Sequence, residues 1–155
     1  MLWRQCPAQL KKNLMRIMSS KIIYSSTILA PISIGELIDK ITILEIKQIN
    51  MTGIKLKNIN KEMKLLKNIL QDKNLEINID LIKNLKKVNK KLWEIEDNIR
   101  IKESNQEFDE EFIKLARSVY IENDKRASIK KEINQKYNSD LVEEKSYKNY
   151  KNLNL

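Results

Sequence analysis

The sequence predicts an all-α fold, an antiparallel helical bundle or coiled-coil hairpin of about four helices with a short extended N-terminal arm. Glycine and proline occur only twice each in 155 residues, which is too few for a turn-rich all-β fold. Charged residues make up 33% of the chain and aromatic residues 6%, a balance that fits long amphipathic helices. Apolar residues recur at three-four spacing through most of the chain after residue 33.

The first helix is predicted to begin after Ser33, which forms an S-x-x-E capping box with Glu36. Four apolar residues then form a stripe at three-four spacing: Ile34, Leu37, Ile41 and Leu44. Ile38 and Ile43 widen this stripe, so we expect the helix to be buried on more than one side. It should run to about Asn50.

Two further helices follow with narrow stripes, which indicate packing between neighbouring antiparallel helices. The second carries Leu56, Ile59, Met63, Leu66 and Leu70; the third carries Leu81, Leu85, Val88, Leu92, Ile95 and Ile99. Residues 74–79 are the expected loop between them, and Asp80 is a candidate cap for the third helix, which should end near Glu103.

The fourth helix is predicted to begin after Asp109, a good N-cap, with Phe108 stapled onto Ile113. It should end near Asn138, which tolerates a left-handed backbone conformation. Residues 139–142 are expected to dock back onto the helices.

The chain divides into three predicted regions: a basic extension and arm over 1–28, a helical domain over 29–147, and a disordered tail over 148–155. Residues 22–32 are the only β-like stretch, with a short strand expected at 28–30. Residues 1–17 fit either an organelle-type presequence or an over-extended gene start, with translation beginning at Met15 or Met18.

Histidine is absent and Cys6 is the only cysteine, which excludes an internal disulfide, His-dependent catalysis and His-ligated metals. We therefore expect no catalytic residue, no metal and no cofactor. The net charge of +9 allows a nucleic-acid interpretation, but the lysines at 83–91 lack interleaved aromatic and arginine residues, so a solvated helix face is favoured. No segment has the length and apolarity of a membrane span or an export signal, which predicts a cytoplasmic protein.

The fourth helix contains a polar break in its apolar stripe. Val119 and Ile129 lie on one face, and between them that face carries Glu122, Asn123 and Arg126. Buried polar groups need partners, so residues 122–126 are the best candidate for a site.

Other polar residues can join this break in one layer. The candidate layer or ligand site consists of Glu45, Trp93, Glu96, Asp97, Arg100, Arg117, Asn123, Asp124 and Arg126. As a structural network, it would pair Arg126 with Glu45 or Glu96, and Asp97 with Arg100 or Arg117. As a binding site, Arg126, Asn123 and Trp93 would receive a small anionic or sugar-like ligand.

Four blocks resemble a small bacterial family of unknown function: ISIGELIDKITILEIK, LKKVNKKLWEIEDNIR, FIKLARSVYIENDKRASIKKEIN and SDLVEEKSY. The resemblance covers about residues 29–147 and leaves residues 1–17 outside. It implies a short, helix-rich protein and brings no established activity, although relatives are expected near genes for cell-surface glycan synthesis.

Two functions follow from the sequence. The first is a non-catalytic helical module that binds another protein or itself, because the chain has long helices with strict stripes and no catalytic motif. The alternative is an accessory or ligand-binding protein of cell-surface glycan or nucleotide-sugar metabolism that uses the Arg126–Asn123–Trp93 region.

Overall fold

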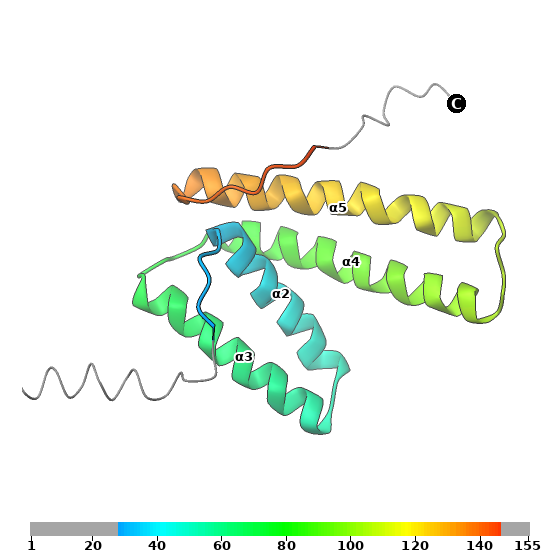
Figure 1. The fold of residues 1–155 in the computed structure, drawn as a ribbon, viewed down its shortest axis with the longest axis horizontal. Coiled ribbons are helices and arrows are strands. Elements are labelled where there is room, and N and C mark those ends of the chain that lie inside the picture. The colour runs from blue at the N-terminus through cyan, green and yellow to red at the C-terminus, as the bar shows by residue number, and fades with distance from the viewer. Residues whose placement is uncertain (1–27, 147–155) are drawn as a thin grey trace, which may run out of the picture. The chain divides into compact units, whose positions relative to one another are not determined.

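The computed structural model of the protein describes residues 28–146. Within that range the chain forms four helices, namely α2 (Ile34–Asn50), α3 (Gly53–Asp72), α4 (Ile79–Ser104) and α5 (Glu110–Lys136) (Figure 1). The predicted all-α class is confirmed. The strand expected at 28–30 is wrong, because residues 28–33 form neither helix nor strand and no second strand is described that could pair with them. The predictions for residues 1–27 and 147–155 lie outside the described residues.

The central element of the bundle is α2. It packs against α3, α4 and α5, whereas α3 packs against α2 (Figure 1). Helices α4 and α5 run antiparallel, side by side, as one long hairpin.

The core consists of two apolar clusters that meet on α2. One joins α2 to α3 through Leu37, Ile41, Leu44, Ile59 and Met63; the other joins α2 to the base of the hairpin through Ile38, Leu81, Leu85 and Ile133. Because α2 contributes to both, the expectation that this helix is buried on more than one side is confirmed.

The N-terminus of α2 is capped from three parts of the chain. The Ser33 hydroxyl accepts from the amide of Glu36 at 3.1 Å, which confirms the predicted cap. The side chain of Asn134 on α5 accepts from the amide of Gly35 at 2.7 Å, and the hydroxyl of Ser139 accepts from the amide of Ile34 at 3.2 Å. Tertiary contacts therefore satisfy amides that a helix end leaves open.

Gly35 lies at a close contact between α2 and α5. A Cβ atom at this position would lie 2.6 Å from the backbone oxygen of Lys130 and 2.9 Å from Oδ1 of Asn134. Only glycine fits this contact without moving a helix.

The other helix ends follow the sequence with one correction. Asn78, not Asp80, caps α4, because its side chain accepts from the amides of Asp80 and Leu81. Asp109 caps α5 as predicted, and Phe108 packs edge-on against Phe112, with ring centroids 5.3 Å apart. The contact of Phe108 with Ile113 stays a prediction. Asn138 has the expected left-handed conformation, with φ +49°.

Candidate functional site

A buried polar triad joins α2 to α4. Nδ2 of Asn89 donates to Oδ1 of Asp39 at 2.7 Å and to the hydroxyl of Thr42 at 2.9 Å. All three residues are buried, and Oδ1 of Asn89 has no hydrogen-bond partner among the described residues. Sequence reasoning missed Asn89, although its position between Val88 and Leu92 on the α4 stripe was a usable signal.

A second polar contact fastens the tail to the bundle. Nζ of Lys130 donates to the carboxylate of Glu36 on α2 at 2.6 Å and to that of Glu143 in the tail at 2.7 Å. Burial by itself would lower the pKa of Lys130, but the two carboxylates outweigh it and raise the pKa. The hydrogen bond from Lys130 is the main reason that the pKa of Glu143 lies below its usual value. The predicted docking of residues 139–142 is confirmed by this ion pair and by Ser139.

One residue of the polar break on α5, Glu122, is buried and paired. Glu122 is 3% exposed, and its Oε1 accepts from Lys91 of α4 at 2.7 Å and from Lys125 at 2.8 Å. Burial opposes ionisation of this carboxyl, but hydrogen bonds from Lys125 and Lys91 prevail and lower its pKa. The partners of Glu122 are thus lysines. The carboxylate partners that the sequence suggested were those of Arg126, another residue of the break.

Most of the other predicted residues have partners of their own. Glu45 pairs with Lys67 and Lys86, at 3.5 and 2.7 Å. Arg100 pairs within α4, with Glu96 at 3.1 Å and Asp97 at 3.7 Å.

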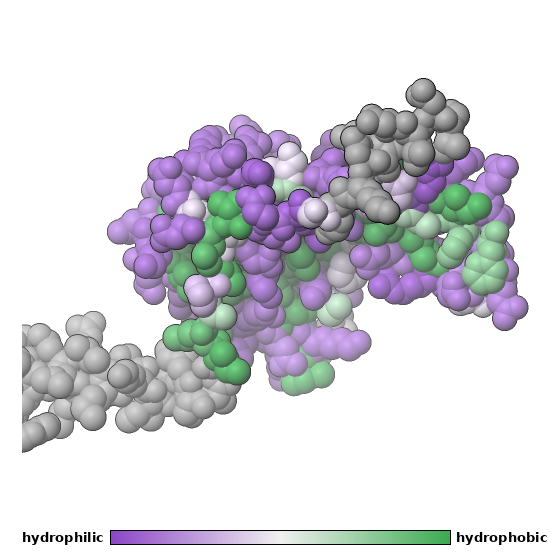
Figure 2. Space-filling view, turned by 45° about the horizontal axis from the view of Figure 1, so that its top comes forward, coloured by the Kyte–Doolittle hydropathy of each residue, from purple (hydrophilic) through white to green (hydrophobic). Residues whose placement is uncertain are grey.

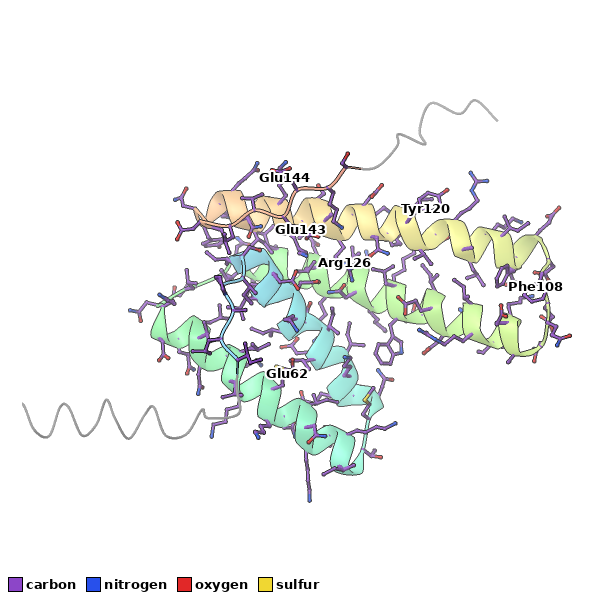
Figure 3. The ribbon with its side chains drawn as sticks, in the orientation of Figure 1. Glu62, Phe108, Tyr120, Arg126, Glu143 and Glu144 are labelled. Carbon is purple, nitrogen blue, oxygen red and sulfur yellow. The ribbon has the colours of Figure 1, made fainter. Side chains whose placement is uncertain are left out.

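The remaining predicted residues lie on α4 and α5. Arg117 is exposed, whereas Trp93, Asn123, Asp124 and Arg126 are half-buried. The amide of Asn123 donates to the backbone oxygen of Val119 in its own helix. Figure 3 shows Arg126 and Glu143 close together where the tail runs along α5, and the charge of Arg126 helps lower the pKa of Glu143.

The nine predicted residues do not form one layer through these contacts. The two expected partners of Arg126 are engaged elsewhere, Glu45 with lysines and Glu96 with Arg100. The pair of Asp97 with Arg100 does occur, but within one exposed helix face.

A different arrangement becomes visible when the hairpin is divided in two. We call residues 79–92 of α4 and 125–136 of α5 the proximal half, and residues 93–124 the distal half. Helix α2 packs on the proximal half and diverges from the distal half (Figure 1).

The α2-facing side of α4 continues into the distal half. Residues seven or eleven positions apart lie on nearly the same face of an α-helix, since about 3.6 residues make a turn. Glu96 and Arg100 therefore lie on the same face as Asn89, which contacts α2, but both are exposed.

The same continuation holds for α5. Phe112 and Ala116 precede Lys130 and Asn134 by eighteen positions, about five turns, and so share the face that meets α2. Asn123 lies on this face as well. We call the resulting surface of the distal half the open face; it consists of Glu96, Arg100, Phe112, Ala116 and Asn123.

The distal half buries very little apolar surface. Ile95 is the only apolar side chain of residues 93–124 that is buried. Phe108, at the loop end of the hairpin (Figure 3), is 59% exposed, and Ile113 is 55% exposed. Figure 2 shows apolar side chains at this end of the hairpin beside charged ones.

Charge is segregated along the hairpin in a way that the sequence reading did not notice. The distal half holds ten acidic and four basic residues, a net charge of −6. The proximal half holds ten basic and two acidic residues, a net charge of +8. The overall balance of +9 therefore hides an acidic surface.

Within residues 28–146 no group of three or more His, Cys, Asp or Glu side chains is arranged so that it could hold a metal ion. None of the helices in this range is long and apolar enough to cross a membrane.

The comparison with protein families matches residues 28–152 to a family of unknown function (DUF6165). The chain belongs to this family. The predicted resemblance is thereby confirmed, with a range close to the expected 29–147. Neither the curated proteins nor the solved structures contain a match to the chain.

Proposed function

We propose that the protein is a non-catalytic helical module that binds another protein chain through the open face. The observation that carries the proposal is the near absence of buried apolar side chains in the distal half, where Ile95 stands alone. A two-helix hairpin without a third helix leaves its open face in water, whereas a docked chain would bury that face.

The energetic reason is the partial exposure of large side chains. Phe112 on the open face is half-buried, and so are four apolar side chains elsewhere in the distal half, namely Trp93, Ile99, Leu115 and Val119. Completing the burial of one such side chain contributes about 1 kcal/mol, since full burial is worth about 1.5–3 kcal/mol. Several together are enough to support a specific complex.

Site-specific photo-crosslinking in the cells that make the protein tests the proposal. A photoreactive phenylalanine derivative replaces Ala116 on the open face or Asn98, which follows Asn89 by nine positions and so lies on the opposite side of α4. Both positions are exposed, so neither replacement disturbs the core. We expect a discrete crosslinked product from position 116 and none from position 98. Absence of any product at position 116 would contradict the proposal.

A second candidate function rests on Arg126. This residue is half-buried, and no hydrogen bond or ion pair to it is found within residues 28–146. An anionic group such as a nucleotide-sugar diphosphate could use its planar set of donors. Under this alternative, uridine diphosphate glucose raises the melting temperature of the native chain, and Arg126→Lys removes that shift while leaving the unliganded melting temperature unchanged. An equal shift of the melting temperature in the native chain and in Arg126→Lys would contradict this alternative.

A further inference from the structure

We propose that the partner of the open face is a second copy of this chain, and that two hairpins pack antiparallel about a two-fold axis into a four-helix bundle. This inference rests on the proposed function, because it names the chain that the open face binds. It requires a surface that is complementary to itself, since a two-fold interface brings the same patch of both copies together.

Charge on the open face meets this requirement. The face carries one acidic and one basic side chain, Glu96 and Arg100, so its net charge is zero and a second copy is not repelled. The two residues lie one turn apart on α4 and pair with each other at 3.1 Å. When two α4 helices pack antiparallel with the axis midway between these residues, Glu96 of each copy faces Arg100 of the other. Both side chains are exposed, so exchanging a partner within the helix for one across the interface costs little.

The side chains of α5 show the same symmetry. Ala116 is the small residue of the open face, and two aromatic residues, Phe112 and Tyr120, lie one turn away on either side of it. Phe112 is half-buried, and Tyr120, labelled in Figure 3, is 38% exposed. When two α5 helices cross antiparallel at Ala116, the small side chains allow a close approach, and Phe112 of each copy faces Tyr120 of the other. Such aromatic pairs supply apolar burial that the distal half lacks.

The register of the hairpin is fixed by two ion pairs between α4 and α5. Lys91 pairs with Glu122 at 2.7 Å, and eleven residues further along α4, Lys102 pairs with Glu111 at 3.1 Å. Glu111 precedes Glu122 by eleven residues as well, so the two helices keep one antiparallel register over the distal half. Each step along α4 from the first pair is therefore level with one step back along α5.

One axis then serves both helices. The point midway between Glu96 and Arg100 is position 98, seven residues beyond the first ion pair, which is level with position 115 on α5. Ala116, the centre of the aromatic pair, is one residue away, about 1.5 Å along the helix. The charged pair and the aromatic pair lie on different helices, so the agreement of their centres supports a single two-fold axis.

The size of the surface sets the strength of the dimer. The distal part of α4, from Trp93 to Ser104, is about 18 Å long at about 1.5 Å per residue, and two adjacent helices are about 20 Å wide. The footprint is therefore about 360 Å² on each copy, which is small beside the roughly 800 Å² per partner of a stable complex. We expect a dimer that dissociates in the micromolar range.

Sedimentation equilibrium of the full chain tests the inference at concentrations from about 5 to about 500 μM. We expect a reversible equilibrium between monomer and dimer. Glu96→Arg leaves only positive charge on the open face, and Arg100→Glu leaves only negative charge. Each variant should weaken the dimer at least about tenfold, because the two-fold axis repeats every unfavourable pair. An equimolar mixture of the two variants should recover the dimer, since each positive side chain then faces a negative one.

Glu94→Arg is the matched control. Glu94 also forms an exposed pair within α4, with Lys90 at 3.7 Å, but it is two positions from Glu96 and so lies on the opposite side of the helix. This variant makes the same charge change and should alter the dissociation constant less than about twofold. The mixture controls for folding, because an unfolded variant would not restore the dimer.

Three results would overturn the inference. A chain that stays monomeric at about 500 μM has no such interface. Equal weakening by Glu96→Arg and Glu94→Arg would place the dimer contact on another surface. A mixture of Glu96→Arg and Arg100→Glu that stays monomeric would contradict the reciprocal pairing.

The crosslink at position 116 separates this inference from the proposed function. A product with twice the mass of the chain supports both. A product with a different protein overturns the inference and leaves the proposed function standing. No product at position 116 contradicts the proposed function itself.

Discussion

The two halves of the α4–α5 hairpin have the same helices and the same stripe spacing, but only one of them has a core. In the proximal half Leu85 and Ile133 are 0% exposed. In the distal half the stripe residues Ile99, Leu115 and Val119 are only half-buried. The difference is α2, which covers the proximal half alone. A helical stripe therefore indicates which side can be buried, whereas a third element determines whether it is.

Polar groups differ less between the halves than apolar groups do. Asp39, Asn89, Lys130 and Asn134 are buried in or against the proximal half and have tertiary partners. In the distal half Glu122 is buried against Lys91, and Lys102, with 15% of its side chain exposed, pairs with three carboxylates, those of Glu107, Asp109 and Glu111. Arg100 pairs with neighbours in its own helix at the surface, and exposed pairs of that kind contribute little to stability.

The largest expected effect is the contrast between two leucine truncations. Leu85→Ala should lower the free energy of unfolding by about 3–4 kcal/mol, because it removes a fully buried side chain and leaves a cavity. Leu115→Ala should cost only about 1 kcal/mol, because that side chain is partly in water. Urea unfolding of the two variants measures both values. Equal losses would mean that the distal half is also covered in the isolated protein, which would contradict the difference between the two halves.

A somewhat smaller effect is expected at Gly35, where α2 contacts the backbone of α5. Gly35→Ala should lower the free energy of unfolding by about 2–3 kcal/mol, since the new Cβ meets the backbone of α5 and cannot be relieved by a rotamer change. The matched control is Gly53→Ala, which has open space around it but a φ of +61°, and should cost about 1 kcal/mol. Thermal unfolding shows which of the two variants loses more stability. A larger loss in Gly53→Ala than in Gly35→Ala would contradict the assignment of Gly35 as the helix contact.

The buried carboxylate at the boundary between the halves should have a modest effect. Glu122→Gln keeps the shape but removes the charge that Lys91 and Lys125 approach, and should cost about 1 kcal/mol because both lysines are largely exposed. The control Glu96→Gln changes an exposed pair within α4 and should cost close to zero. Chemical denaturation of the native protein, Glu122→Gln and Glu96→Gln measures these losses. Indistinguishable midpoints would show that Glu122 does not contribute to stability.

The smallest effect concerns the tail and pH. The pKa of Glu143 is lower in the folded protein than its ordinary value of 4.5, so its contact with Lys130 is present above pH 4.5 and is lost as pH falls through the lowered pKa. We expect nuclear magnetic relaxation of residues 139–146 to report a mobile tail below that pH while the helices remain folded.

Two variants sharpen this measurement. Glu143→Gln should make the tail mobile already at neutral pH, because it removes one of the two carboxylates on Lys130. Glu144→Gln should leave the tail unchanged, since Glu144 makes only a 3.8 Å pair with Lys131 at the surface. A tail that stays ordered in Glu143→Gln would show that Ser139 alone holds it.

Much of the fold was predictable from local signals. Ser33 and Asp109 cap their helices because a side-chain oxygen needs only the next turn of its own helix as a partner. Asn138 ends α5 in the left-handed conformation for an equally local reason. Asn78 takes the place of Asp80 as the cap of α4 because the helix begins two residues earlier than the stripe suggested.

The candidate site was less predictable. The polar break at Glu122 was visible as a violation of the stripe, but its partners were not, since Lys91 and Lys125 are two among many similar lysines. The only sequence signal for the buried contact of Asn89 with Asp39 was the position of Asn89 on the apolar stripe. Arg126 was expected to meet a carboxylate on α2 or α4, but Glu45 and Glu96 are engaged by other basic residues.

For residues 28–146 the sequence by itself determined the four helices, their stripes and most of their ends, because these depend on interactions within a few residues. Only the tertiary structure decided that α2 divides the hairpin into a covered half and an open half. That outcome depends on the crossing of α2 over α4 and α5 at Gly35, a contact between residues about a hundred positions apart in the chain. Because α2 crosses there, the apolar stripes of α4 and α5 are covered in the proximal half and remain partly exposed in the distal half.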